Sequence, residues 1–179
     1  IDSVESKQGS ASYTAVVSNT GIDPFTTVKT NSSGKANLKI LLSPEGPGSL
    51  EPECYMSVNT RAEVFPYGGS DNTLISMETG AMSCSHHDNR VIGVEIEGAG
   101  EVIFLGTGVK MSLHPGEDAT IAVAEGSVRF LPFVPLFEDG RLREEIEMPE
   151  GDEIFVDLVA QEVEQRRPQF SEKDREIFE

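Results

Sequence analysis

The strongest constraint on this chain is a succession of short β-type segments separated by clusters of Gly, Pro, Asn and Ser. Such segments recur about every 8–12 residues from Tyr13 onward, and no twelve-residue stretch before residue 158 repeats at the helical period of about 3.6. The pattern predicts an all-β fold of two antiparallel sheets packed face to face, with a jelly roll as the expected arrangement. The predicted strands are 13–18, 25–30, 36–42, 55–65, 73–77, 90–96, 101–105, 109–113, 119–124, 127–131 and 153–160.

The chain of 179 residues is long enough for one domain with a sizeable core. We expect residues 1–12 to be a polar N-terminal arm, residues 13–160 to be the single β domain, and residues 161–179 to be a C-terminal extension. Ser171 and Asp174 have the spacing of a helix-capping pair, which predicts a short helix in the extension. Two interpretations of the extension stay open: a solvated tail, or an arm that docks through its apolar residues. These apolar residues are Phe170, Ile177 and Phe178.

The charge is strongly acidic, with 31 Asp and Glu against 14 Lys and Arg and a formal net charge of −17. This balance disfavours direct binding to nucleic acid, whose phosphates would be repelled, and no apolar run approaches the ~18–20 residues of a membrane span. A protein adapted to high salt and an ordinary acidic protein both fit this composition.

The two cysteines, Cys54 and Cys84, both fall in strand-like contexts. One disulfide between neighbouring strands is possible, and two buried free thiols fit equally well.

The three histidines are the candidate metal ligands. His86 and His87 stand next to Asp88, and His114 lies in a later turn. Imidazole and carboxylate groups bind Zn, Fe or Mn. Adjacent side chains of a strand point to opposite faces, however, so His86 and His87 cannot share one metal unless they lie in a loop. We therefore expect no metal, no cofactor and no catalytic residue, and no enzyme activity.

Residues 93–130 alternate strands with Gly turns and include the turn Leu113-His114-Pro115-Gly116-Glu117. This run resembles the barrel of the cupin family, which implies a small jelly-roll barrel. Cupins bind metal through a His-x-His pair with a Glu and through a later third His. Here His86 and His87 lack the spacer, and no His follows Gly126. The resemblance makes a cupin-like enzyme or a small-ligand-binding barrel the alternative function.

The segment 130–137 is apolar throughout and contains two prolines, which excludes a central strand. Either it crosses the bottom of the core, or it offers an apolar contact to another subunit through Phe133 and Phe137.

A polar arm, a β-sandwich and an acidic extension together resemble, in layout, the single-jelly-roll capsid proteins of viruses. This resemblance implies a structural protein that assembles with copies of itself or with a second related chain, as the coat protein of a virus in a salt-adapted system. The implied location is the virion or the extracellular space. A secreted or cell-surface adhesion module is a further alternative.

Overall fold

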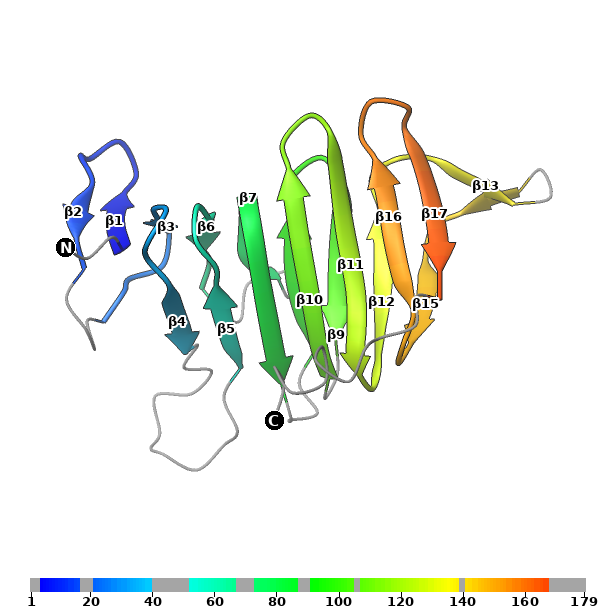
Figure 1. The fold of residues 1–179 in the computed structure, drawn as a ribbon, viewed down its shortest axis with the longest axis horizontal. Helices are drawn as coiled ribbons and strands as arrows, with labels where there is room; N and C mark the ends of the chain where they lie inside the picture. The colour runs from blue at the N-terminus through cyan, green and yellow to red at the C-terminus, as the bar shows by residue number, and fades with distance from the viewer. Residues whose placement is uncertain are drawn as a thin grey trace.

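The computed structural model of the protein describes residues 4–16, 21–39, 52–66, 73–86, 91–104, 107–138 and 141–167. Every regular element in these ranges is a β-strand, which confirms the all-β prediction (Figure 1). Fifteen strands form one continuous sheet that is folded into two layers, and two more form a separate hairpin. No helix in these ranges has the length and apolar character needed to cross a membrane.

The two layers, called here the first and the second sheet, share one long strand, β7. The first sheet runs in the order β2 (Thr14–Ala15), β1 (Val4–Gln8), β3 (Thr26–Thr30), β6 (Arg61–Val64), β7 (Thr73–His86), β8 (Ile92–Ile96), β9 (Gly100–Phe104), β12 (Ser127–Pro132) and β15 (Ile146–Pro149). The second sheet runs in the order β4 (Ala36–Lys39), β5 (Glu53–Met56), β7, β10 (Thr107–His114), β11 (Asp118–Glu125), β16 (Glu153–Asp157) and β17 (Glu162–Arg166). The hairpin of β13 (Leu136–Glu138) and β14 (Arg141–Arg143) projects from one end (Figure 1).

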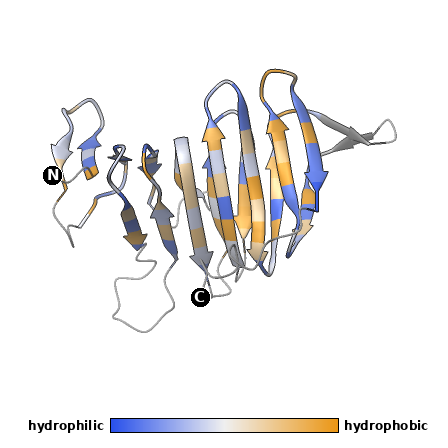
Figure 2. Cartoon of the chain, in the orientation of Figure 1, coloured by the Kyte–Doolittle hydropathy of each residue, from blue (hydrophilic) through white to orange (hydrophobic). Residues whose placement is uncertain are grey.

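The core lies between the sheets and follows from the alternation of apolar and polar residues along each strand (Figure 2). In-register rows of buried residues cross each sheet. One row in the first sheet is Ile75, Val94, Val102, Phe130 and Ile146. One row in the second sheet is Met82, Met111, Ile121 and Ile154. Burying each such side chain contributes roughly 1.5–3 kcal/mol, so these rows hold the two layers together.

At one corner of the fold, three neighbouring stretches of chain pass side by side from one sheet to the other. β3 continues into β4, β5 continues into β6, and β7 bends between Thr79 and Gly80 without interruption. At the bend, Gly80 has a φ of +96°, and a Cβ there would lie 2.5 Å from the Cα of Thr60. A glycine is therefore required where β7 turns the corner.

Two buried hydroxyl groups hold this corner. The Thr30 hydroxyl accepts a hydrogen bond from the Thr60 N–H at 2.9 Å and donates one to the Ser57 carbonyl at 2.6 Å. The Thr60 hydroxyl accepts a hydrogen bond from the Ala81 N–H at 3.0 Å. Thr30 and Thr60 are 5% and 1% exposed. The three crossing stretches are thus joined by side-chain hydrogen bonds that strand pairing cannot make.

The jelly-roll arrangement is not confirmed. Strands adjacent in sequence pair as hairpins, β7 and β8 pair in parallel, and β7 belongs to both sheets. The single strand predicted over 55–65 is wrong: it is divided into β5 and β6 by a turn in which Asn59 has a φ of 54°.

Segments that were expected to be terminal arms contribute strands to the sheets. Part of the predicted arm 1–12 forms β1, which is held by its polar groups: Lys29 lies 2.6 Å from Glu5 and 4.0 Å from the ring centre of Tyr13. The boundary expected at residue 160 separates β16 from β17, which pair in register. The predicted helix after Ser171 lies outside the described residues.

Prediction for the corner: Gly80→Ala should destabilise the protein much more than Gly116→Ala. Gly116 also has a positive φ, +75°, but nothing lies within 4 Å of a Cβ placed there. Gly116→Ala therefore adds only left-handed strain of about 1–2 kcal/mol. Gly80→Ala adds to this an overlap with Thr60, which contributes a further ~1–3 kcal/mol. Urea unfolding measures both variants, and equal losses of unfolding free energy would contradict the role assigned to Gly80.

Candidate binding face on the second sheet

The outer face of the second sheet presents one continuous row of side chains that are in register across six strands. Cys54 and Met56 point into the core, so Tyr55 between them points outward, where its side chain is 56% exposed. Tyr55 pairs with Ser83 of β7, and Ser83 pairs with Lys110 of β10. The row continues through Ala122, Glu153 and Arg166.

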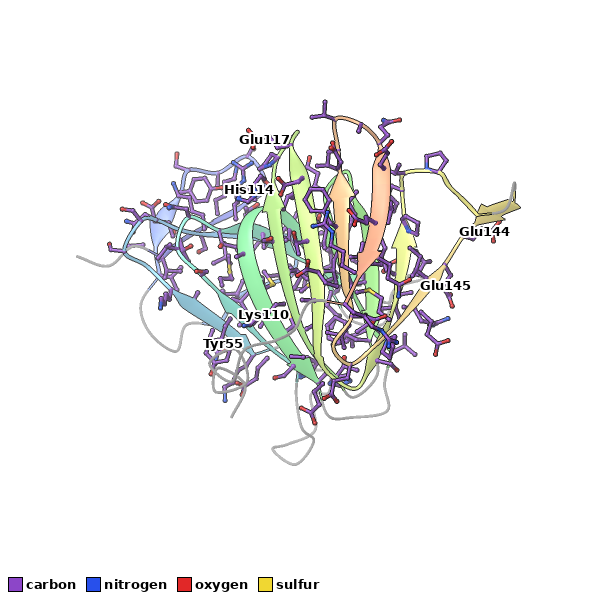
Figure 3. The ribbon with its side chains drawn as sticks, turned by 45° about the vertical axis from the view of Figure 1, so that its right-hand side comes forward. Tyr55, Lys110, His114, Glu117, Glu144 and Glu145 are labelled. Carbon is purple, nitrogen blue, oxygen red and sulfur yellow. A yellow bond between two sulfur atoms is a disulfide. The ribbon has the colours of Figure 1, made fainter. Side chains whose placement is uncertain are left out.

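A hollow of about 530 Å³ opens around the first half of this row. Its size is within the range of sites that take a small ligand or a few side chains of a peptide. Tyr55 and Lys110 lie near each other on this face (Figure 3). The lining residues are Lys35, Tyr55, Met56, Ser57, Ala81, Met82, Ser83, Cys84, Ser85, Gly108, Lys110 and Glu125.

The polar groups of the hollow are two ammonium groups, one phenol, three serine hydroxyls and one carboxylate. Lys35 and Lys110 outnumber Glu125 there, although acidic residues exceed basic residues more than twofold in the whole chain. Among its described lining residues, the hollow thus carries more ammonium groups than carboxylates, which suits a partner with carboxylate groups.

The outer face of the first sheet contains a pair of neighbouring carboxylates. Glu95 of β8 pairs directly with Glu101 of β9, an arrangement that is unfavourable for like charges. Both carboxylates accept hydroxyl hydrogen bonds, from Ser76 to Glu95 at 3.2 Å and from Thr73 to Glu101 at 2.5 Å. This acidic pair on the first sheet contrasts with the hollow on the second sheet, where Lys35 and Lys110 stand with one carboxylate among the described lining residues.

A disulfide between Cys54 and Cys84 lies directly beneath the hollow. The two residues pair in register on β5 and β7, and both are 1% exposed. The sequence left open a bridge and free thiols, and the structure has the bridge. By closing a loop with a sequence separation of 30, it stabilises the fold by about 3–4 kcal/mol on the chain-entropy scale. It also fixes β5, and with it Tyr55, against β7.

At the other end of the row, polar contacts hold β17 in place. Asp152 is 3% exposed and accepts hydrogen bonds from Gln165 Nε2 at 2.7 Å and from Arg167 Nε at 2.9 Å. The guanidinium of Arg166 lies 4.6 Å from the ring centre of Phe155. These contacts hold β17, whose side chains are mostly polar, against β16.

The structure does not bring the candidate metal ligands together. His86 is buried at the end of β7, where it pairs with Thr107 at the start of β10. His114 lies at the other end of β10, seven residues and roughly 24 Å away, and His87 lies outside the described residues. His114 instead forms an ion pair with Asp118, with Nδ1 and Oδ1 2.8 Å apart.

Of the predicted assembly contacts, Phe133 is 55% exposed, and Phe137 lies in β13. Phe170, Ile177 and Phe178 lie outside the described residues. Tyr55 and Lys110 were not predicted from the sequence. The alternation of Glu53-Cys54-Tyr55-Met56 could have placed Tyr55 on the face opposite the buried Cys54, but it says nothing about Lys110, which reaches this face through long-range pairing.

No protein-family model and no curated protein matches the chain. Two crystal structures have a similar fold, and each is described as a candidate anti-sigma factor from Parabacteroides distasonis ATCC 8503. The first has a TM-score of 0.57 at 14% identity, over 79% of this chain and 59% of that one. The second has a TM-score of 0.52 at 13% identity, over 74% of this chain and 60% of that one. The chain thus spans about three fifths of each of these proteins.

The predicted function as a viral capsid protein is wrong. The structures that share this fold carry a regulatory description and not that of a coat protein. The error came from the layout: polar ends around a β-sandwich do not define a capsid protein, and here both ends supply strands to the sheets.

Prediction for His114: its pKa should lie above the ordinary value of about 6.5, because its hydrogen bond and its charge interaction with Asp118 favour the protonated ring. A raised pKa means that the pair stabilises the fold at pH below the unfolded pKa and that this stability is lost as pH rises through the folded pKa. The pair is largely exposed, so the effect on stability stays below about 1 kcal/mol. NMR titration of His114 in the wild type and in Asp118→Asn measures the shift, and an unchanged pKa in the variant would contradict this assignment.

Proposed function

We propose that this chain is a non-catalytic binding domain of a regulatory protein that works outside the cytoplasm. The observation that carries the proposal is the hollow around Tyr55 and Lys110, which lies on an open sheet face and has two lysines and one carboxylate among its described lining residues. Such a face suits contact with a partner polypeptide that carries carboxylate groups.

The regulatory part of the proposal is supported by the fold. Both solved structures compared above are described as candidate anti-sigma factors. At 13–14% identity their likeness concerns the fold, and the binding role is therefore argued from the side chains of the hollow.

The location is supported by the disulfide. Disulfides form and persist in oxidising compartments and are rare in the cytosol. The bridge between Cys54 and Cys84 is buried within the core cluster, so its formation belongs to folding. We infer a secreted or extracytoplasmic location.

Binding is favoured over catalysis by the chemistry of the hollow. Its side chains are mainly ammonium, phenol and hydroxyl groups, with Glu125 as the carboxylate. The two histidines that the structure describes are not among the lining residues. No histidine among the described residues therefore stands beside these serine hydroxyls as a general base.

Prediction for the regulatory role: removing the gene from the source cell should change the transcription of a defined set of genes. The wild-type gene should restore these transcripts, and a Lys110→Glu variant should not, because it reverses the charge of the hollow. The matched control is Arg129→Glu on the first sheet, which changes the charge by the same amount on the opposite face and should restore them. RNA sequencing of the parent strain, the deletion strain and the three complemented strains measures these transcripts. Transcripts that do not respond to the deletion, or that respond equally to both variants, would contradict the proposal.

A further inference from the structure

We propose that residues 162–167, called here the strap, form a releasable edge of the fold that is fastened by the charge of Asp152. When this fastening is lost, the strap detaches while both sheets stay folded. The strap consists of β17 and the next residue, and among the described strands β17 pairs only with β16 (Figure 1). The inference concerns a conformational change and does not rest on the proposed binding function.

The strap adds little to the hydrophobic core. Of the five side chains of β17, only Val163 packs against the core, and it is partly buried. The other four side chains are polar and exposed. Edge segments with few buried apolar contacts belong to the least stable parts of a fold, so strand pairing with β16 needs support from other contacts.

These other contacts converge on one buried carboxylate. Asp152 lies in the turn between β15 and β16 and is 3% exposed. It accepts a hydrogen bond from Gln165 Nε2 at 2.7 Å and another from Arg167 Nε at 2.9 Å. Gln165 Nε2 also lies 3.5 Å from the carbonyl oxygen of Glu147 in β15. The strap thus closes the edge of the sandwich where β15 ends one sheet and β17 ends the other.

The remainder of this edge has its own support. The Asp152 N–H donates to the Pro149 carbonyl at 3.1 Å, and the Asp152 carbonyl accepts from the Val123 N–H at 2.9 Å. β16 pairs with β11 on its other side, and its residues Ile154 and Val156 are fully buried in the core. None of these contacts involves the strap, so its loss is a local opening of the fold.

The fastening depends on the ionised form of Asp152. A carboxylate has acceptor oxygens only and serves the Gln165 and Arg167 donors at once, whereas an amide has one acceptor oxygen and an NH2 donor. Asp152→Asn therefore opposes a donor to one of these two donors with almost no change in volume. Release of the strap would leave one side of β16 with unpaired backbone N–H and C=O groups, an edge to which another strand can add.

Native-state hydrogen exchange of the full chain tests the proposal. In the wild type, the β17 amides that pair with β16 should exchange through a local opening and be less protected than the β10 amides. In Asp152→Asn, protection of these β17 amides should fall roughly ten- to hundredfold, because a hydrogen bond to a charged group is lost, while protection in β10 stays unchanged.

Two further variants sharpen the test. Glu164→Gln is the matched control, because it makes the same carboxylate-to-amide change on an exposed side chain of the strap itself and should leave the protection of β17 unchanged. Arg167→Ala removes one donor of the fastening from a side chain that is 80% exposed. It should lower the protection of β17 by itself and add little to Asp152→Asn, since both changes remove the same hydrogen bond.

The other outcomes overturn the inference. If the β17 and β10 amides are equally protected in the wild type, the strap opens only with the whole fold. If Asp152→Asn lowers protection in β10 as much as in β17, or yields a chain that does not fold, Asp152 supports the entire sandwich. Unchanged protection of β17 in Asp152→Asn or in Arg167→Ala would reject the fastening, and an equal loss in Glu164→Gln would make it a general effect of charge.

Discussion

The fold depends on two threonine hydroxyls at the corner where the chain changes sheets. Thr60 accepts the Ala81 N–H, and its own N–H is donated to Thr30. Without these hydroxyls, buried N–H groups would be left unsatisfied, at about 1–3 kcal/mol each. The reason for this dependence is geometric. A strand that bends from one sheet into another loses ladder partners at the bend, and Gly80 leaves no side chain there to supply them. The hydroxyls of Thr30 and Thr60, on the neighbouring stretches, supply the missing hydrogen-bond acceptors.

The binding face is a consequence of the same corner. β5 reaches the second sheet only because the chain crosses at Thr60, and the disulfide then fixes β5 against β7. Tyr55 projects outward because Cys54 beside it projects inward. Lys110 is brought opposite Ser83 by the pairing of β10 with β7. The hollow is therefore assembled from residues that are far apart in sequence, on strands whose register is set by the buried rows beneath them.

The sequence was sufficient for the strands with an apolar face and insufficient for the rest. Alternation located β8, β10, β11 and β16 closely, since each of these strands buries every second residue. It could not reveal the corner in 55–65, because Met56 and Ala62 keep the same parity although they belong to different sheets. It missed β1 and β17 because ion pairs and a buried carboxylate hold these polar strands. The face around Tyr55 and Lys110 depends on long-range register, for which a single sequence has no local signal.

Native-state hydrogen exchange at the corner tests the account most directly. If the corner supports both sheets, the amides of Thr60 and Ala81 should exchange only through global unfolding, with the same free energy as urea unfolding. In Thr60→Val, the free energy of opening at Ala81 should fall further than that of the β10 amides, because Ala81 loses its acceptor. If Thr60 and Ala81 exchange in the wild type through a local opening while the β10 amides stay protected, the corner is a peripheral feature and the account is contradicted.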